Sequence, residues 1–247
     1  MPTPAAAADH ASALDPLAVS DFGRRLRAWY RRSARDLPWR RTRDAYRILV
    51  SELMLQQTQV SRVVPKYHEF LKTFPSLAHV ARATPDRVME AWSGLGYYAR
   101  ARNLHKLAVH VTSDGTRRRA KLPSEAHELR ALPGIGAYTA GAVASFAYGK
   151  RAALVDTNVA RVLSRVFAPA LSPKRPRDLT AIWRIAERSL PRTGTATWTH
   201  NQALMELGAL VCTARVAHCA RCPVRPVCAT AAASRPSRPS RNPAAGV

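Results

Sequence analysis

Apolar residues recur at steps of three to four positions along most of this chain, which is the spacing of one face of an α-helix. Phe22, Leu26 and Trp29 follow that step near the N-terminus, and Ile48 and Leu49 begin a second such stretch. Six further helices are predicted over residues 85–92, 98–111, 137–148, 158–167, 176–190 and 198–210. No alternation of apolar and polar residues typical of a β-strand persists outside these stretches. The pattern therefore predicts an all-α fold.

The residues that break helices lie between the predicted helices, at Pro38, Pro75, Gly94, Gly96, Pro123, Pro133, Pro169 and Pro191. The helical pattern stops near both ends of the chain, where residues 1–15 are rich in Ala and Pro and residues 231–247 are mainly Ala, Ser, Pro and Arg. Segments with so few large apolar side chains cannot bury enough surface to fold. We expect disordered tails at 1–19 and 231–247, and one folded unit at 20–230, built as one domain or as two closely packed lobes.

The chain carries 39 Lys and Arg against 16 Asp and Glu, a formal net charge of +23 over 247 residues. Such a surplus attracts polyanions from a distance, so nucleic acid is the expected partner. A basic surface that only keeps the protein soluble is the alternative. No apolar run approaches the roughly 18 residues of a membrane-spanning helix. No secretory leader follows Met1, which favours the cytoplasm.

All four cysteines lie in one short segment, at Cys212, Cys219, Cys222 and Cys228, with six, two and five residues between them. This spacing allows one loop to surround a single centre with four thiolates, as an iron–sulfur cluster or a tetrahedral zinc ion requires. Two disulfides are the alternative, which a reducing compartment disfavours. Zinc sites usually pair two C-x2-C motifs, and only Cys219 and Cys222 form one, so the spacing slightly favours a cluster.

A Pro-Gly-x-Gly turn joins two helices at Pro133, Gly134 and Gly136. Glycine lets the backbone approach another group closely, and the helix that follows presents its free amide hydrogens to a nearby phosphate. An ordinary tight turn is the alternative for so short a motif. Asp156 lies eighteen residues after Tyr138, at the start of the next predicted helix, where it is also a good N-cap residue.

Several motifs occur in the same order as in one known family. They are LPWR at 37–40, SELMLQQTQV at 51–60, GLGYYARARNL at 94–104 and LPGIGAYTAG at 132–141, followed by the four cysteines. On these motifs, residues 22–228 resemble the helix-hairpin-helix DNA glycosylases of the endonuclease III superfamily, and within it the MutY-type adenine DNA glycosylases. The resemblance implies a two-lobed fold and excision of adenine from A:8-oxoguanine or A:G mispairs in double-stranded DNA. It also implies that the four cysteines hold a [4Fe-4S] cluster.

Tyr138 stands at the hairpin position where the resemblance places a lysine in the strand-cleaving members. An amine forms the Schiff base that precedes strand cleavage, and a phenol cannot form that bond. A monofunctional enzyme that leaves an abasic site is therefore implied. Thymine mismatch glycosylases of the same branch also carry tyrosine there, so T:G or U:G mispairs remain an alternative substrate. A DNA-binding module without catalytic activity is a further alternative.

Glu52 lies in an apolar helical stretch, where loss of water should raise its pKa and keep its proton near neutral pH. Adenine leaves poorly until a ring nitrogen is protonated, so an acid here favours a purine substrate. A glutamate on a solvated helix face is the alternative. The resemblance implies that Asp156 is ionised and supports the sugar cation, with Tyr138 beside it and Asn158 holding it.

The same resemblance implies which residues contact DNA when the adenine leaves the stack. Gln57 and Tyr98 would wedge around the orphan base, Trp39 and Arg40 would line the adenine pocket, and Gly134 and Gly136 would approach a phosphate. MutY-type enzymes commonly continue into a second domain that recognises 8-oxoguanine. This chain ends at residue 247, nineteen residues after Cys228 (247 − 228), so we expect no such domain and a narrower preference for 8-oxoguanine over guanine. We also expect a monomer.

Overall fold

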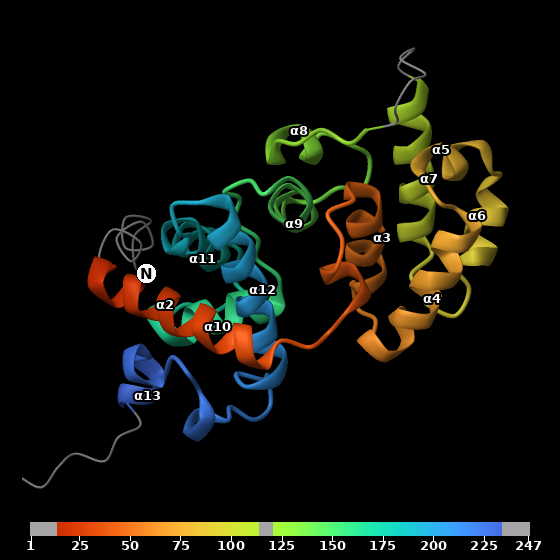
Figure 1. Ribbon diagram of the computed structural model, residues 1–247. Coiled ribbons are helices and arrows are strands. Elements are labelled where there is room, and N and C mark those ends of the chain that lie inside the picture. The colour runs from red at the N-terminus through yellow and green to blue at the C-terminus, as the bar shows by residue number, and fades with distance from the viewer. Residues whose placement is uncertain (1–13, 114–120, 234–247) are drawn as a thin grey trace, which may run out of the picture.

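The computed structural model describes residues 14–113 and 121–233, and within these ranges it is helical, as predicted (Figure 1). No strand occurs there, and the single β-bridge joins Cys212 to Ala217. No helix in the described part is long and apolar enough to cross a bilayer. The α-helices are α2 (Pro16–Ser33), α3 (Ala45–Leu55), α4 (Val60–Thr73), α5 (Leu77–Arg82), α6 (Pro85–Ala91), α7 (Ala99–Ser113), α8 (Ala126–Arg130), α9 (Ala137–Tyr148), α10 (Thr157–Phe167), α11 (Pro176–Ser189), α12 (Gly194–Leu210) and α13 (Ala229–Ala233). Short 3₁₀ turns are η1 (Pro38–Arg40), η2 (Cys219–Arg221) and η3 (Arg225–Val227).

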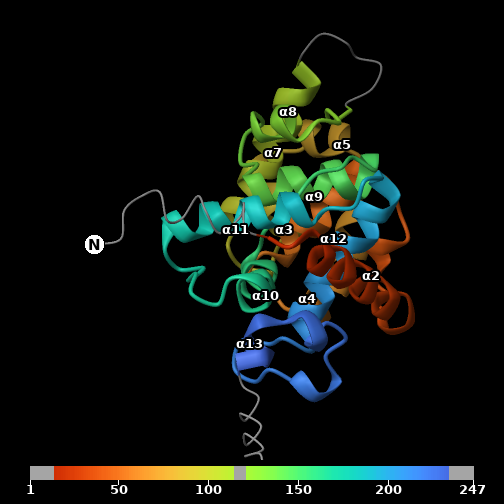
Figure 2. The same cartoon turned by 90° about the vertical axis from the view of Figure 1, so that its left-hand side faces the viewer.

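The helices form two lobes that meet where α3 packs against α9 (Figure 1). One lobe is continuous in sequence and consists of α4 to α7, with α5 packed along α7. The other lobe combines both ends of the chain, because α2 packs against α12 and α10 contacts both α11 and α12. In Figure 2 the cysteine loop and α13 lie below this second lobe, where α13 contacts α10.

Each lobe has its own aromatic centre. In the α4–α7 lobe, the Phe70 and Trp92 rings meet edge to face with centroids 5.5 Å apart, and both side chains are fully buried. In the other lobe, Phe22 meets Phe167 edge to face at 5.0 Å. Edge-to-face pairs of this kind add specific geometry to the burial of apolar area. These two aromatic centres belong to one continuous apolar core that runs through the junction of the lobes.

Helix α3 lies at that junction and is buried on nearly all sides, with eight of its eleven residues buried. It begins at Asp44, whose carboxylate accepts a hydrogen bond from the Arg47 amide at 2.8 Å. A helix without a polar face belongs in the interior of a protein. Glu52 is therefore carried into the interior by the apolar residues on either side of it.

The structure corrects the predicted boundaries in several places. Helices α4, α5, α8 and α13 were not predicted; α4 holds Pro65 in its interior, and the other three have only five or six residues. Helix α2 begins at Pro16 and is capped by Asp15, so the predicted tail over residues 1–19 extends too far. Helix α13 likewise passes the predicted end of the folded unit at residue 230. The remainder of both predicted tails lies outside the described residues.

Candidate active site

A cavity of about 610 Å³ lies at the junction of the two lobes, between α3, α9, α10, α12 and the segment around η1. Residues from distant parts of the sequence share its walls. Seven of the predicted site residues line it, namely Trp39, Arg40, Glu52, Gln57, Tyr138, Asp156 and Asn158. Tyr98, Gly134 and Gly136 are not among its lining residues and lie elsewhere.

Glu52 is 2% exposed and projects from α3 into this cavity. The pKa of Glu52 is raised from 4.5 to about 7, chiefly by burial; the hydrogen bond from Tyr138 and the charge of Arg40 act against this rise, and the charge of Asp156 adds to it. Loss of water penalises the charged form, which explains the direction. Near neutral pH this carboxyl group therefore holds its proton for much of the time and is able to donate it.

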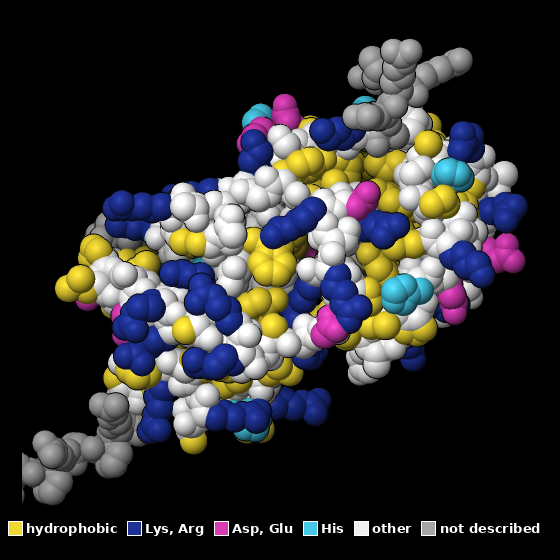
Figure 3. Space-filling model, in the orientation of Figure 1, with side chains coloured by type: hydrophobic (Ala, Val, Ile, Leu, Met, Phe, Trp, Pro, Cys, Tyr) yellow, Lys and Arg dark blue, Asp and Glu magenta, His cyan; other side chains and the backbone are white. Residues whose placement is uncertain are grey.

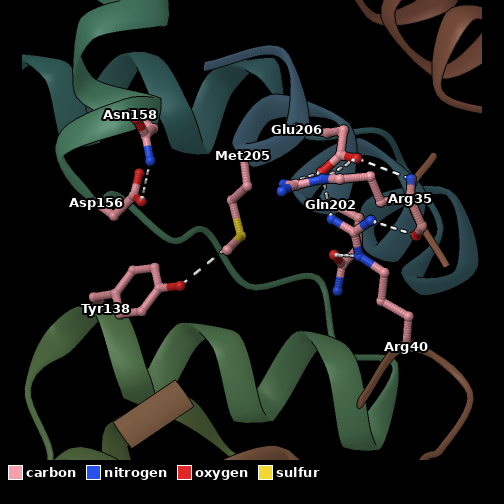
Figure 4. Close-up of polar contacts among 8 residues, drawn as sticks. All are labelled: Arg35, Arg40, Tyr138, Asp156, Asn158, Gln202, Met205 and Glu206. Atoms are coloured by element: carbon pink, nitrogen blue, oxygen red, sulfur yellow. Dashed lines mark hydrogen bonds and ion pairs between the residues drawn. The ribbon is translucent and has the colours of Figure 1, made fainter. Parts of the chain in front are cut away.

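Tyr138 lies in the first turn of α9, and its hydroxyl donates a hydrogen bond to Glu52 Oε2 at 2.6 Å. The same hydroxyl lies 3.8 Å from Met205 Sδ (Figure 4). Burial, with the charges of Glu52 and Asp156, raises the pKa of Tyr138 well above 10. The phenol remains protonated, so it serves as a fixed donor that orients the Glu52 carboxyl group.

Asp156 is the N-cap of α10, as the sequence predicts, and its Oδ1 accepts a hydrogen bond from the Val159 amide at 2.6 Å. Asn158 Nδ2 donates to the other oxygen at 3.3 Å (Figure 4). Burial nevertheless raises the pKa of Asp156 above its ordinary 3.8, while these donors and Arg161 act in the opposite direction. The sequence argument expected an ionised carboxylate and did not foresee this burial, so the contrast with Glu52 is smaller than expected.

Arg161, which the sequence analysis did not single out, links Asn158 to the cysteine loop. Its Nη2 donates to Asn158 Oδ1 at 2.6 Å and to the Gly208 carbonyl at 2.8 Å, and its Nε donates to the Cys212 carbonyl at 2.9 Å. A Cβ atom on Gly208 would lie 2.7 Å from Asn158 Cβ, so this close approach requires glycine. The cap residue Asp156 is thus held by a hydrogen-bonded chain that begins at the loop.

A second buried glutamate lies at the other end of the cavity. Glu206 on α12 accepts hydrogen bonds from Arg35 Nε at 2.9 Å, Arg35 Nη2 at 2.8 Å and Arg40 Nη2 at 2.8 Å (Figure 4). Arg40 Nε also donates to Gln202 Oε1 at 2.9 Å. These arginines lower the pKa of Glu206 to about 2, although burial alone would raise it. Sequence reasoning missed Glu206, but its signal was the same as that of Glu52: a glutamate within an apolar helical stretch.

Trp39 follows Leu37 and Pro38 in η1 and is 6% exposed, with its ring edge to face with Tyr67 at 5.6 Å. It therefore forms a rigid apolar wall of the cavity, next to the polar group around Arg40. A flat apolar wall with a few placed polar groups is typical of a pocket for a planar ligand.

The two predicted wedge residues lie on neighbouring loops at the ends of α3 and α7. Gln57 has φ of 56°, and Tyr97, next to Tyr98, has φ of 48°. They are the only described residues other than glycine with positive φ. Tyr97 is 57% exposed and Tyr98 is 41% exposed. Strained backbone and exposed aromatic rings on adjacent loops are features of a contact surface and not of a core.

The predicted hairpin joins α8 to α9. Gly134 has φ of +75°, and a Cβ atom there would lie 2.5 Å from Asn103 Cβ, so this turn requires glycine. Gly136 is the residue before α9, and a Cβ atom on it would meet no other atom within 4 Å. The first amides of α9 have no helical partner. Lys and Arg side chains are spread across the face of the molecule seen in Figure 3, where acidic side chains are few.

All four cysteines are free thiols, which excludes the two-disulfide alternative in this structure. They line one cavity of about 330 Å³ together with Arg165, Arg215 and Arg225. Within the described residues, no three Cys, His, Asp or Glu side chains converge closely enough to hold a single metal ion. Four cysteines in the wall of one cavity are the residues that either an iron–sulfur cluster or a zinc ion would use as ligands.

Comparison with known proteins adds an independent observation. A protein-family model described as "HhH-GPD superfamily base excision DNA repair protein" matches residues 50–185. The adenine DNA glycosylase of Mycolicibacterium smegmatis is 47% identical over 196 residues, which covers 78% of this chain and 64% of that protein. The adenine DNA glycosylase of Homo sapiens is 40% identical over 214 residues, covering 83% of this chain and 38% of that protein. The chain therefore spans less than two thirds of the length of these relatives.

Solved structures show the same architecture. A thermostable thymine-DNA glycosylase matches with a TM-score of 0.78 and 29% identity, covering 87% of this chain and 97% of that one. Endonuclease III in a non-covalent DNA complex matches with a TM-score of 0.72 and 20% identity, covering 89% of this chain and 98% of that one. At 20% identity the second match shows the fold alone.

Proposed function

Because this chain belongs to the HhH-GPD superfamily of base excision DNA repair proteins, we propose that it is a DNA glycosylase that removes adenine mispaired in double-stranded DNA. The observation that carries the proposal is Glu52, a buried carboxyl group with a pKa of about 7 in the wall of a cavity at the lobe junction. Adenine, unlike thymine, becomes a good leaving group when a ring nitrogen gains a proton. Relatives named adenine DNA glycosylase support the same base.

The reaction is a hydrolysis in which Glu52 and Asp156 have separate roles. Glu52 donates its proton to a ring nitrogen of the flipped adenine while the bond between adenine and deoxyribose breaks, and the bonding electrons leave with the base. Asp156, held by Val159 and Asn158, stabilises the positive charge that develops on the sugar. Water then adds to the sugar carbon and its proton passes to the Glu52 carboxylate, which restores the starting enzyme. The products are free adenine and an abasic site.

Tyr138 makes the enzyme monofunctional. Its hydroxyl is protonated and occupied by Glu52, and a phenol cannot form a Schiff base with the sugar. We therefore expect no strand break until the abasic site is treated with alkali. Replacing Tyr138 with Lys would place an amine beside Asp156 and should add weak strand cleavage, which a sequencing gel without alkali detects.

The protein holds DNA by its charge and by the two loops that carry Gln57 and Tyr98. A net charge of +23 supplies attraction that is independent of sequence. The exposed Tyr98 ring and Gln57 enter the duplex where the adenine leaves, and the hairpin around Gly134 and Gly136 accepts a phosphate on its free amides. The base opposite the adenine is 8-oxoguanine or guanine, and the enzyme acts as a monomer.

A second function has one specific observation in its favour. The thymine-DNA glycosylase that matches with a TM-score of 0.78 indicates that T:G or U:G mispairs are a reasonable alternative substrate. Thymine does not need the proton that Glu52 provides, so a thymine or uracil substrate would not explain why the enzyme keeps a carboxyl group with a raised pKa at position 52.

A panel of duplexes tests both readings. Duplexes containing A:8-oxoguanine, A:G, T:G, U:G and A:T are incubated with excess enzyme, and each sample is analysed with and without alkali. Release of adenine from the first two, with breaks only after alkali, is the expected result. Release of thymine or uracil alone would overturn the adenine assignment and leave a glycosylase. Binding without release of any base would show a DNA-binding module.

The four cysteines hold a [4Fe-4S] cluster in this proposal. The cavity that they line and the basic side chains around it support a group of that size, and the cluster would fix a loop with little apolar content of its own. Iron and acid-labile sulfide analysis of the purified protein, with its visible absorption, tests the assignment. Stoichiometric zinc without iron would contradict it.

A further inference from the structure

Arg100 is a buried cation with an unusual set of partners. It is 7% exposed, and its guanidinium donates only to uncharged oxygen atoms. Nη1 donates to the carbonyls of Leu53 at 2.7 Å, Met54 at 2.9 Å and Gln56 at 2.6 Å. Every one of these acceptors belongs to the end of α3 or to its cap residue.

The other side of the same guanidinium holds the loop before α7. Nη2 donates to the carbonyls of Leu95 at 3.2 Å and Gly96 at 3.0 Å, and Nε donates to the Tyr97 carbonyl at 3.3 Å. The guanidinium carbon also lies 5.3 Å from the centre of the Tyr97 ring. One planar group therefore spans both loops, from the chain after Leu55 to the chain before Ala99.

The position of Arg100 in its own helix makes this arrangement informative. It is the second residue of α7, where the positive end of the helix dipole disfavours a cation. The carbonyls at the end of α3 have no helical partners and form the negative end of that dipole, so they attract one. The positive charge of Arg100 therefore stabilises the C-terminal end of α3 and not its own helix α7. This indicates that the main role of the residue is to link the two elements.

Both loops depart from relaxed backbone geometry at the point where Arg100 holds them. The positive φ values belong to Gln57, one residue after the Gln56 carbonyl, and to Tyr97, whose own carbonyl is an acceptor. Strained backbone persists only where the surroundings over-determine it. The side chains presented next to these positions are Gln57 and Tyr98, which enter the duplex in the proposed function.

We propose that Arg100 is a positioning residue that fixes Gln57 and Tyr98 relative to each other, so that both loops enter the duplex as one wedge and evert the target base. This inference rests on the proposed function for its reaction, but not for its geometry. It predicts that the spanning shape of the guanidinium is required, and that positive charge alone is insufficient.

Arg100→Lys tests the shape at constant charge, because an ammonium is a single point and cannot reach both loops. Arg102→Lys is the matched control: it makes the same substitution two residues further along α7, on an exposed side chain that donates a weak hydrogen bond to Met89 Sδ at 3.9 Å. For Arg100→Lys we expect the single-turnover rate of adenine release to fall on the order of tenfold to a hundredfold. For Arg102→Lys we expect it to remain unchanged. A merely structural loss would lower the amplitude of the reaction, through a smaller active fraction, and leave its rate constant intact.

A double-mutant cycle locates the effect. If Arg100 acts through the wedge, then adding Arg100→Lys to a Gln57→Ala, Tyr98→Ala protein should cause little further loss, whereas independent contributions would multiply. Multiplied losses, or an undiminished rate in Arg100→Lys, would overturn the proposal.

Base eversion is read separately from chemistry in a Glu52→Gln background, with 2-aminopurine placed beside the target nucleotide. The rise in fluorescence on binding should be smaller with Arg100→Lys than with Arg102→Lys. If the enzyme releases thymine and not adenine, the adenine assignment fails, yet this fluorescence difference still decides the role of Arg100.

Discussion

The two ends of the central cavity contain the same side chain, with pKa values shifted in opposite directions. Glu52 is 2% exposed and Glu206 is 0% exposed, so burial does not distinguish them. Burial raises the pKa of Glu52 to about 7, and the one hydrogen bond from the neutral Tyr138 hydroxyl lowers it too little to offset that effect. The pKa of Glu206 is lowered to about 2, because two guanidinium groups donate to it.

The difference shows that partners, and not burial alone, decide what a buried carboxyl group does. A carboxylate that is paired and hydrogen-bonded keeps its charge, and here it orders Arg40 and Gln202 along one wall of the cavity. A carboxyl group with one neutral partner keeps its proton. In the proposed function, the ordered polar groups beside Glu206 would bind the edge of the base, and Glu52 would protonate it.

The largest expected effect is on catalysis at the Glu52 end. Glu52→Gln removes the proton and keeps the shape, so adenine release should fall by roughly 10²- to 10⁴-fold while duplex binding is retained. Because the raised pKa of Glu52 penalises the folded state at alkaline pH, this variant should also be no less stable than the parent at pH 8. Single-turnover assays and thermal melts check both points. Release of adenine at the parental rate would remove the basis of the proposed mechanism.

At the Glu206 end the expected loss is in stability. Glu206→Gln removes the counter-ion of two arginines, the buried Arg40 and the partly buried Arg35. The free energy of unfolding should fall by about 3 kcal/mol, because a buried charge is left unpaired. Urea denaturation of this variant beside Glu52→Gln gives the contrast directly. Equal stability of the two variants would show that the arginines find other partners.

The pH dependence should separate the two ends further. Adenine release needs protonated Glu52, so its rate should be highest below about pH 7 and fall about tenfold per pH unit above that value. Glu206 acts in the opposite range: its folded pKa of about 2 lies below the ordinary 4.5, so its contribution to stability is present above pH 4.5 and is lost as the pH falls toward 2. A pH–rate profile measures the effect of Glu52 on activity, and acid denaturation measures the effect of Glu206 on stability. An activity that rises between pH 7 and 9 would contradict the role of Glu52 as an acid.

The smallest expected effect comes from Tyr138→Phe. Its hydroxyl lowers the pKa of Glu52, so removing it should raise that pKa and move the falling limb of the pH–rate profile to higher pH. Loss of the hydrogen bond should also cost about 1 kcal/mol of stability. A pH–rate profile of the variant checks the sign, and a shift to lower pH would show that the hydroxyl acts in another way.

The sequence revealed the local features of this molecule and missed the distant ones. The apolar helix around Glu52 and the N-cap position of Asp156 can be recognised within a few residues, and the resemblance to the adenine DNA glycosylases assigned them their roles. Arg100 was missed because its acceptors Leu53 and Met54 precede it by more than forty residues. These acceptors are also backbone carbonyl groups, which every residue has, so the sequence does not mark them. Glu206 was missed although its apolar neighbours gave the signal used for Glu52. The ion pair that keeps Glu206 charged is formed with Arg35, which lies 171 residues away in the sequence.

That separation of 171 residues between Arg35 and Glu206 has a consequence for biosynthesis. The lobe that combines both chain ends cannot close until α12 has left the ribosome, and contacts between such distant segments form slowly. A nascent chain already carries Glu52 and Asp156, but it lacks the wall that completes their cavity. In the proposed function, the nascent chain therefore cannot excise a base until α12, the last long helix, has packed against α2.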